Sequence, residues 1–123
     1  MASSDDSAFQ IERRGDVTII RAAPEIESLG WDLIEQAADL VLQPIRNQKC
    51  PLVLIAMDDV NYFGSVFLSL LLRCWKEVST KGGMMVLSGV SKRARELLRV
   101  TSLDTLWAIY DSEQEALSVL VSD

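Results

Sequence analysis

A serine hydroxyl is the best-placed candidate for chemistry in this chain. Ser65 follows a polar, turn-prone segment, residues 58–64 (DDVNYFG), and begins a helix that we predict over residues 65–81, with Gly82 as its C-cap. At a helix start, a hydroxyl can accept hydrogen bonds from the amides of the first turn. A phosphate on that hydroxyl would lie in the same field of amides and helix dipole. Ser65 is therefore a candidate for a helix cap or for a phosphoacceptor.

Two aspartates at the beginning of the same segment could take part in metal or phosphate chemistry. Asp58 and Asp59 directly follow an apolar run, as the phosphoacceptor aspartate of receiver domains follows a strand. Receiver chemistry also needs an acidic pair after the first strand and a lysine after the last, and residues 22–23 (AA) and 110–111 (YD) supply neither. We therefore expect Asp58 and Asp59 to be solvated loop residues that cap nearby amides.

Two further groups of side chains could bind a partner. Tyr62 and Phe63 could form an exposed aromatic patch beside Ser65, since aromatic residues anchor many interfaces, although alternation predicts that one of the two is buried. The chain also has one basic cluster, which could steer an acidic partner or a phosphate but is more simply interpreted as a solvated helix face. This cluster consists of Lys92, Arg93, Arg95 and Arg99.

The composition argues against catalysis and against several classes of partner. The chain has 123 residues, a net charge of −6 and no histidine, so it lacks the commonest general acid–base group and the commonest transition-metal ligand. It contains no nucleophile elbow, no phosphate-cradling glycine loop and no metal-ligand cluster. We therefore expect a protein that is not an enzyme, has no metal or cofactor, and does not bind nucleic acid.

The N-terminus, the apolar runs and the cysteines indicate the cellular compartment. Residues 1–10 (MASSDDSAFQ) lack the basic and apolar regions of a signal peptide, and no apolar run approaches the roughly 20 residues needed to cross a bilayer. Cys50 and Cys74 have neither metal nor redox spacing, so we expect reduced, structural thiols. The sequence thus predicts a cytoplasmic protein without membrane contact, in which residues 1–7 form a disordered tail.

Hydrophobic periodicity predicts an alternation of strands and helices after an N-terminal hairpin. Strands are predicted at residues 9–12, 17–22, 52–57, 84–87 and 106–109. Helices are predicted at residues 31–43, 65–81, 91–100 and from 113 onward. Pro44 is expected to end or kink the first helix, and Ser91 and Ser112 to cap the last two. Side chains expected in the core include Leu33, Ala37, Leu40, Val41, Trp31, Trp75 and Trp107.

This order of elements predicts a single α/β domain, residues 8–123, in which the hairpin leads into a mainly parallel sheet covered by helices. The succession of segments resembles the STAS domain family, the fold of anti-sigma factor antagonists. The resemblance extends over nearly the whole chain, and four stretches carry it in the order of the family. They are residues 52–65 (LVLIAMDDVNYFGS), 81–87 (KGGMMVL), 93–106 (RARELLRVTSLDTL) and 109–117 (IYDSEQEAL).

In that family, a serine at the start of the second helix is phosphorylated by a partner serine kinase of the histidine-kinase ATPase type, which is also the anti-sigma factor. The unphosphorylated protein binds this partner and thereby frees a sigma factor, and the phosphorylated protein releases it. The resemblance implies that Ser65 is the phosphoacceptor. The family's aspartate before the serine is replaced by Gly64, and its small residues after the serine are replaced by Val66 and Phe67. The implied partner-binding residues are Tyr62, Phe63, Gly64, Ser65 and Phe67.

Two alternatives remain open. The chain could be a scaffold subunit of a stress-signalling complex that assembles with other STAS proteins, without a switch at Ser65. It could instead sense a nucleotide or another anion at the N-terminus of the helix predicted over residues 65–81. The scaffold function predicts large self-assemblies in light scattering, and the sensor function predicts thermal stabilisation by nucleotide.

Overall fold

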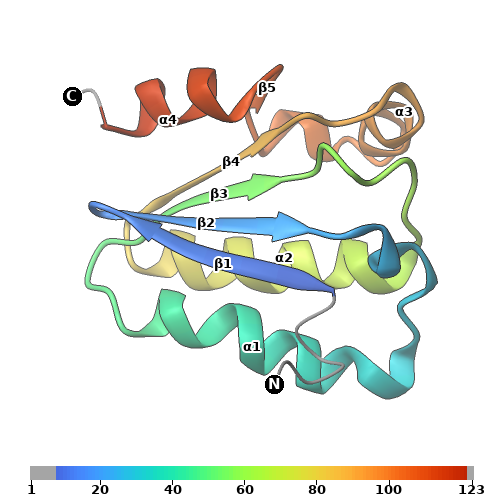
Figure 1. Ribbon diagram of the computed structural model, residues 1–123, viewed down its shortest axis with the longest axis horizontal. Helices are drawn as coiled ribbons and strands as arrows, with labels where there is room; N and C mark the ends of the chain where they lie inside the picture. The colour runs from blue at the N-terminus through green and yellow to red at the C-terminus, as the bar shows by residue number, and fades with distance from the viewer. Residues whose placement is uncertain (1–7, 122–123) are drawn as a thin grey trace.

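The predicted N-terminal hairpin forms one edge of a five-stranded sheet (Figure 1). The computed structural model describes residues 8–121, so the tail expected at residues 1–7 lies outside the described part of the chain. The strands are β1 (Phe9–Arg14), β2 (Val17–Ala22), β3 (Leu52–Ala56), β4 (Met84–Ser88) and β5 (Ile109–Tyr110). Their order in the sheet is β1-β2-β3-β4-β5. The β1–β2 pair is antiparallel and the other pairs are parallel, which confirms the predicted sheet.

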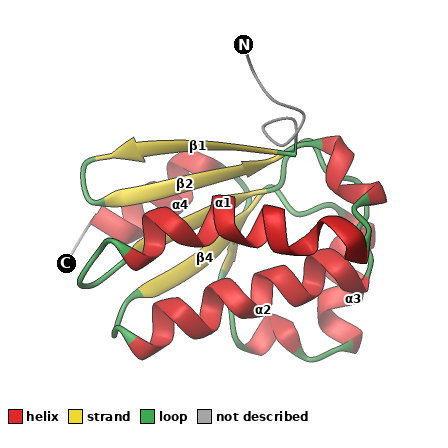
Figure 2. Ribbon diagram, turned by 90° about the horizontal axis from the view of Figure 1, so that it is seen from below, coloured by secondary structure: helices red, strands yellow, loops and turns green. Residues whose placement is uncertain are grey.

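Within residues 8–121, helices cover both faces of this sheet. The α-helices are α1 (Ile34–Arg46), α2 (Ser65–Thr80), α3 (Lys92–Val100) and α4 (Glu113–Val121). Short 3-10 helices are η2 (Pro24–Ser28), η3 (Trp31–Leu33) and η4 (Leu103–Thr105). α1 and α2 lie side by side on one face and α4 lies on the other (Figures 1 and 2), while the buried side chains of α3 join the core of α1 and α2. None of the helices in the described residues has the length and apolar character required to span a bilayer.

Burial on both faces of the sheet explains the unbroken apolar sequence of β3. Val53 and Ile55 pack in the core of α1 and α2, and Leu54 packs in the core of α4. All three side chains are at most 1% exposed. Burial of each such side chain stabilises the fold by about 1.5–3 kcal/mol. A strand between two helical layers therefore needs apolar residues at successive positions.

Each of the three residues in the turn from α2 into β4, Lys81, Gly82 and Gly83, has an identifiable structural role. Gly82 has φ +70°, a left-handed conformation that favours glycine. A Cβ on Gly83 would lie 2.0 Å from the carbonyl oxygen of Pro51, just before β3. The Lys81 ammonium donates to the carbonyl oxygen of Gln48 at 3.1 Å. This turn therefore fixes the position of β4 against the start of β3.

The predicted end and buried stripe of the first helix are partly wrong. α1 continues through Pro44 to Arg46, because a missing amide in the last turn removes only one hydrogen bond and Ile45 is fully buried. The helix also begins later than predicted, after the 3-10 turn η3. This turn leaves Trp31 60% exposed and Leu33 46% exposed, although both were expected in the core.

The last predicted strand is displaced along the chain. Residues 103–105 form η4, and β5 begins only at Ile109, three residues later than predicted. Trp107 lies before the strand and is 2% exposed, as expected for a core residue. Because this large side chain must enter the core, the chain can pair with β4 only after it has passed position 107.

Candidate functional site

The loop that carries the candidate residues lies at the carboxyl ends of the parallel strands. Residues 57–64 connect β3 to α2, and we call this segment the β3–α2 loop. The segments after β2 and β4 lie at the same edge, because parallel strands all end on one side of a sheet. Figure 1 shows the starts of α2 and α3 at this edge. The fold thus brings together three segments that are distant in the sequence.

Hydrogen bonds from two neighbouring segments fix the β3–α2 loop at Asn61. The Asn61 backbone N–H donates to Glu27 Oε2 in η2 at 3.0 Å. The Asn61 carbonyl accepts from Ser91 Oγ at 2.5 Å. Ser91 Oγ also accepts from the Ala94 N–H at 3.1 Å, which confirms the predicted N-cap of α3. Asn61 is therefore the junction between the loop, η2 and α3.

Two phenylalanines anchor the loop and the start of α2 in the core. Phe63 is fully buried and Phe67 is 1% exposed. Their rings meet edge to face with centroids 5.1 Å apart, and Phe67 also stacks on Phe9 of β1 at 6.1 Å. The prediction that one of Tyr62 and Phe63 is buried is confirmed, since Tyr62 remains 39% exposed. Phe63 and Phe67 therefore hold the loop from inside, and their side chains do not reach the surface.

Ser65 is exposed and occupies the first position of α2. The N-cap position belongs to Gly64, whose carbonyl accepts from the Leu68 N–H at 3.2 Å, so Ser65 is not the cap. Within the described residues, the Ser65 hydroxyl has no hydrogen-bond partner. The first turn of α2 contains no acidic residue. A phosphate on Ser65 would therefore lie beside free amides and the positive end of the helix dipole, and no acidic side chain in the first turn would repel it.

The fold has space for a side chain at position 64, where this chain has glycine. Its φ of −104° is available to any residue, and a Cβ added there would meet no atom within 4 Å. The glycine therefore has no steric requirement in this fold. It leaves the backbone beside Ser65 open to close approach by another molecule.

The basic cluster lies next to Tyr62. The Arg93 guanidinium lies over the Tyr62 ring at 4.7 Å from its centroid, an arrangement that favours the cation. Arg95 pairs with Asp111 at 3.3 Å, and Arg99 pairs with Glu96. The hydrogen bond that Arg99 donates to the Glu96 carboxylate raises the pKa of Arg99. Among the described residues, Lys92 and Arg93 of the cluster have no ion pair.

The acidic residues of the loop are exposed, and one of them packs against the turn after β4. Asp58 and Asp59 are exposed, as predicted. The Asp58 carboxylate lies against Gly89, where an added Cβ would be 2.3 Å from its Oδ1. In residues 8–121, no three histidine, cysteine, aspartate or glutamate side chains are grouped so that they could hold a metal ion. The Asp58 carboxylate therefore occupies the space that a side chain at position 89 would need.

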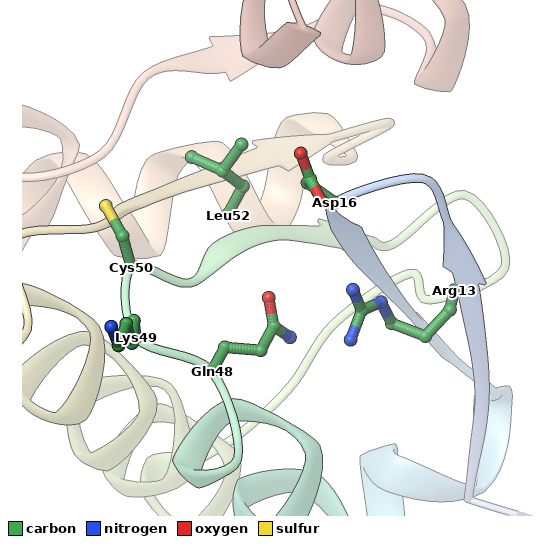
Figure 3. A pocket seen from close by; sticks show the side chains of 6 residues that line it. All are labelled: Arg13, Asp16, Gln48, Lys49, Cys50 and Leu52. Carbon is green, nitrogen blue, oxygen red and sulfur yellow. The ribbon is translucent and has the colours of Figure 1, made fainter.

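Neither the two cysteines nor the cleft beside Cys50 belongs to the β3–α2 loop. Both cysteines are free, and burial raises the pKa of the Cys74 thiol to about 12, which leaves it protonated. A cleft of about 470 Å³ is lined by Arg13, Lys49 and Cys50 among others (Figure 3). It lies near the β1–β2 turn and the start of β3, at the edge of the sheet opposite to the β3–α2 loop. This cleft does not include Ser65, whose side chain is exposed at the start of α2.

The sequence from residue 8 to residue 116 matches the family model of the STAS domain. A protein of Paenibacillus polymyxa named anti-sigma F factor antagonist is 25% identical over 112 residues. This alignment covers 91% of the chain and 93% of that protein. The chain thus resembles this relative over nearly the full length of both proteins.

Solved structures share the fold. An anti-sigma-factor antagonist (STAS) domain protein from Planctomyces limnophilus is 32% identical and superposes with a TM-score of 0.83, covering 93% of this chain and 98% of that one. The anti-sigma factor antagonist SpoIIAA in its unphosphorylated form is 20% identical, with a TM-score of 0.76 and coverage of 90% and 94%. With the match over residues 8–116, these findings show that the chain belongs to the STAS domain family.

Proposed function

We propose that this protein is an anti-sigma factor antagonist whose binding to an anti-sigma factor is controlled by phosphorylation of Ser65. The observation that carries the proposal is the Ser65 hydroxyl, which is exposed at the first position of α2 and has no hydrogen-bond partner among residues 8–121. The names of the relatives from Paenibacillus polymyxa and Planctomyces limnophilus support this class of partner. The proposal assigns no catalysis to the chain and places it in the cytoplasm.

The contact surface in this proposal has an exposed part and a buried support. Tyr62, Gly64 and Ser65 are exposed and touch the partner directly. Phe63 and Phe67 contribute by holding the backbone of these residues in place. A glycine beside the serine lets the partner approach the backbone closely. The unphosphorylated surface therefore offers a neutral hydroxyl and an aromatic ring on a fixed backbone.

Phosphorylation would change the charge of this surface without unfolding it. A phosphoserine carries about −1.5 to −2 charges at neutral pH. Its oxygens can accept from the free amides at the start of α2, where no acidic residue stands in the first turn. The modified helix start is therefore stabilised, while a partner that fits a neutral hydroxyl is repelled. We propose a serine kinase of the histidine-kinase ATPase type as the partner that adds the phosphate.

The experiment that tests this function is phosphopeptide mapping of the protein isolated from its own cells, together with identification of co-purified proteins. We expect phosphate on Ser65 and an anti-sigma kinase among the retained proteins. Ser65→Ala should remove the phosphate. Ser79→Ala, which changes an exposed serine at the other end of α2, should not. An unmodified Ser65 with only other STAS proteins retained would contradict the proposal.

A scaffold function is favoured by one separate observation. Trp31 and Leu33 are large apolar side chains, both exposed, in the 3-10 turn before α1. Exposed apolar side chains that lie close together mark many contacts between proteins. A scaffold subunit would use such a contact to assemble with other STAS domains. Light scattering tests this function, because it predicts large assemblies that Trp31→Ser and Leu33→Ser disperse, whereas the antagonist function predicts a small species.

A further inference from the structure

The N-terminus of α3 carries positively charged side chains, where acidic residues are favoured in helices. Its first two residues are Lys92 and Arg93, and its first turn contains no acidic residue. Cations at this end of a helix are opposed by the helix dipole. By contrast, α4 of the same chain begins with Glu113 and Glu115 in its first turn. The start of α3 is thus a concentrated positive surface on a protein whose net charge is −6.

The two cations at the start of α3 have no acidic partner among residues 8–121. Arg95 and Arg99 have acidic partners, whereas Lys92 and Arg93 have none among residues 8–121. Arg93 instead covers the exposed Tyr62 ring at 4.7 Å. We call Tyr62, Lys92 and Arg93 the Tyr62–Arg93 surface. It combines two free cations with an exposed aromatic ring, and both arginine and tyrosine are enriched where proteins bind tightly.

The Tyr62–Arg93 surface is connected to the candidate phosphoacceptor. Ser91, next to Lys92, donates to the carbonyl of Asn61, next to Tyr62, at 2.5 Å. Tyr62 precedes Ser65 by three residues, so the two Cα atoms are at most about 11 Å apart. This separation is close to the screening length of about 8 Å at physiological salt. A charge on Ser65 is therefore only partly screened from a charged ligand that contacts Tyr62.

We propose that the Tyr62–Arg93 surface binds an acidic segment of the partner protein, and that a phosphate on Ser65 weakens this contact by placing negative charge beside it. The proposal rests on the function proposed above for the identity of the partner. Charge complementarity selects the occupant, since an acidic segment is attracted to Lys92 and Arg93, which have no ion pair among residues 8–121. Nucleic acid is a poorer fit, because it needs more phosphate contacts than two free cations supply.

A first experiment tests the surface without the partner. The isotope-labelled full chain is titrated with a short peptide of glutamate, aspartate and glycine, and backbone amide shifts are followed by NMR at low and at physiological salt. We expect the shifts to concentrate at Tyr62 and at residues 91–95, and to diminish as salt rises. Shifts spread over the whole chain, shifts elsewhere, or stronger binding of a single-stranded oligonucleotide at these residues would overturn the proposal.

A second experiment uses charge reversal and the purified partner identified by co-purification. The double variant Lys92→Glu/Arg93→Glu should weaken partner binding about tenfold or more, mainly through slower association. The matched control is Arg13→Glu/Lys49→Glu, which changes the net charge equally at the cleft on the opposite edge (Figure 3). The control should leave the affinity nearly unchanged. Equal losses in both variants would show a general charge effect and overturn the proposal.

Folding of the charge-reversal variant is not at risk, because acidic residues in the first turn of a helix complement the dipole. Thermal unfolding should therefore show little change in stability when Lys92 and Arg93 are replaced, since this gain offsets the lost contact of Arg93 with Tyr62. The outcomes also separate this proposal from the function on which it rests. If phosphorylation of Ser65 releases the partner while Lys92→Glu/Arg93→Glu binds normally, the antagonist function stands and the acidic contact is wrong.

Discussion

Ser91 makes two hydrogen bonds that substitution can separate, and this gives a sharp prediction for the site. Its Oγ accepts from the Ala94 N–H at 3.1 Å and donates to the Asn61 carbonyl at 2.5 Å. Ser91→Ala removes both. Loss of an N-cap costs about 1 kcal/mol, and loss of a hydrogen bond costs about 0.5–1.5 kcal/mol. We therefore expect Ser91→Ala to lower the free energy of unfolding by about 2 kcal/mol.

Ser91→Asp distinguishes the two bonds, because a carboxylate can cap α3 but cannot donate to Asn61. We expect it to recover about 1 kcal/mol of the loss. Urea unfolding followed by tryptophan fluorescence measures the free energies, since Trp107 is buried in the folded protein. Amide hydrogen exchange measures the loop. Residues 58–64 should exchange faster in Ser91→Asp than in the unmodified protein, while α3 stays protected.

A second helix cap supplies the control for this prediction. Ser112 Oγ accepts from the Glu115 N–H at 3.1 Å at the start of α4, and it has no bond to the β3–α2 loop. Ser112→Ala should therefore cost about 1 kcal/mol. Two results would contradict the two roles of Ser91. One is a cost of Ser91→Ala no larger than that of Ser112→Ala, and the other is unchanged exchange of residues 58–64 in Ser91→Asp.

Three further predictions concern the turns and the pH dependence of stability. Gly83→Ala should cost about 3 kcal/mol in urea unfolding, because its Cβ would clash with backbone at the β3–β4 junction, whereas Gly82→Ala has space and should cost only about 1 kcal/mol. Ser102 has φ +62°, a left-handed conformation that is strained for serine. Ser102→Gly should raise the free energy of unfolding by about 0.5 kcal/mol, because the relief of this strain exceeds the extra backbone entropy that glycine has in the unfolded chain. A lower free energy of unfolding would contradict this prediction. Hydrogen bonds from Arg21, the larger cause, and from Arg14 lower the pKa of Glu12. Its carboxylate therefore stabilises the fold above its unfolded pKa, and the effect is lost as the pH falls through the lowered folded pKa. Glu12→Gln should accordingly be less stable than the unmodified protein at neutral pH but equally stable in acid, and a constant difference at all pH values would contradict the role of this carboxylate.

The parts of the fold that the sequence predicted are those set by local patterns. Residues 52–57 are apolar without interruption, which identifies a strand buried on both faces. Ser91 and Ser112 stand immediately before helical patterns, and both form the expected caps. The start of α2 at Ser65 was also predicted, because the period of apolar residues changes there.

The parts that were missed depend on contacts between distant segments. Asn61 has no distinctive sequence signal, because its backbone groups form the junction with Glu27 and Ser91, which are 34 and 30 residues away. Trp31 is exposed because a 3-10 turn precedes α1 and ends the helical periodicity, which hydrophobicity alone does not reveal. The contact of Arg93 with Tyr62 likewise requires knowledge that α3 begins beside the β3–α2 loop.

The proposed function requires that the exposed Ser65 hydroxyl controls the binding of an anti-sigma factor. The most direct test compares the affinity of the purified partner for the unmodified protein, for the protein phosphorylated on Ser65, and for Ser65→Ala treated with the same kinase. We expect tight binding of the unmodified protein and of Ser65→Ala, and a loss of affinity of tenfold or more, about 1.4 kcal/mol, for the phosphorylated protein. Equal affinities for all three proteins, or phosphate found at another residue, would contradict the proposed function.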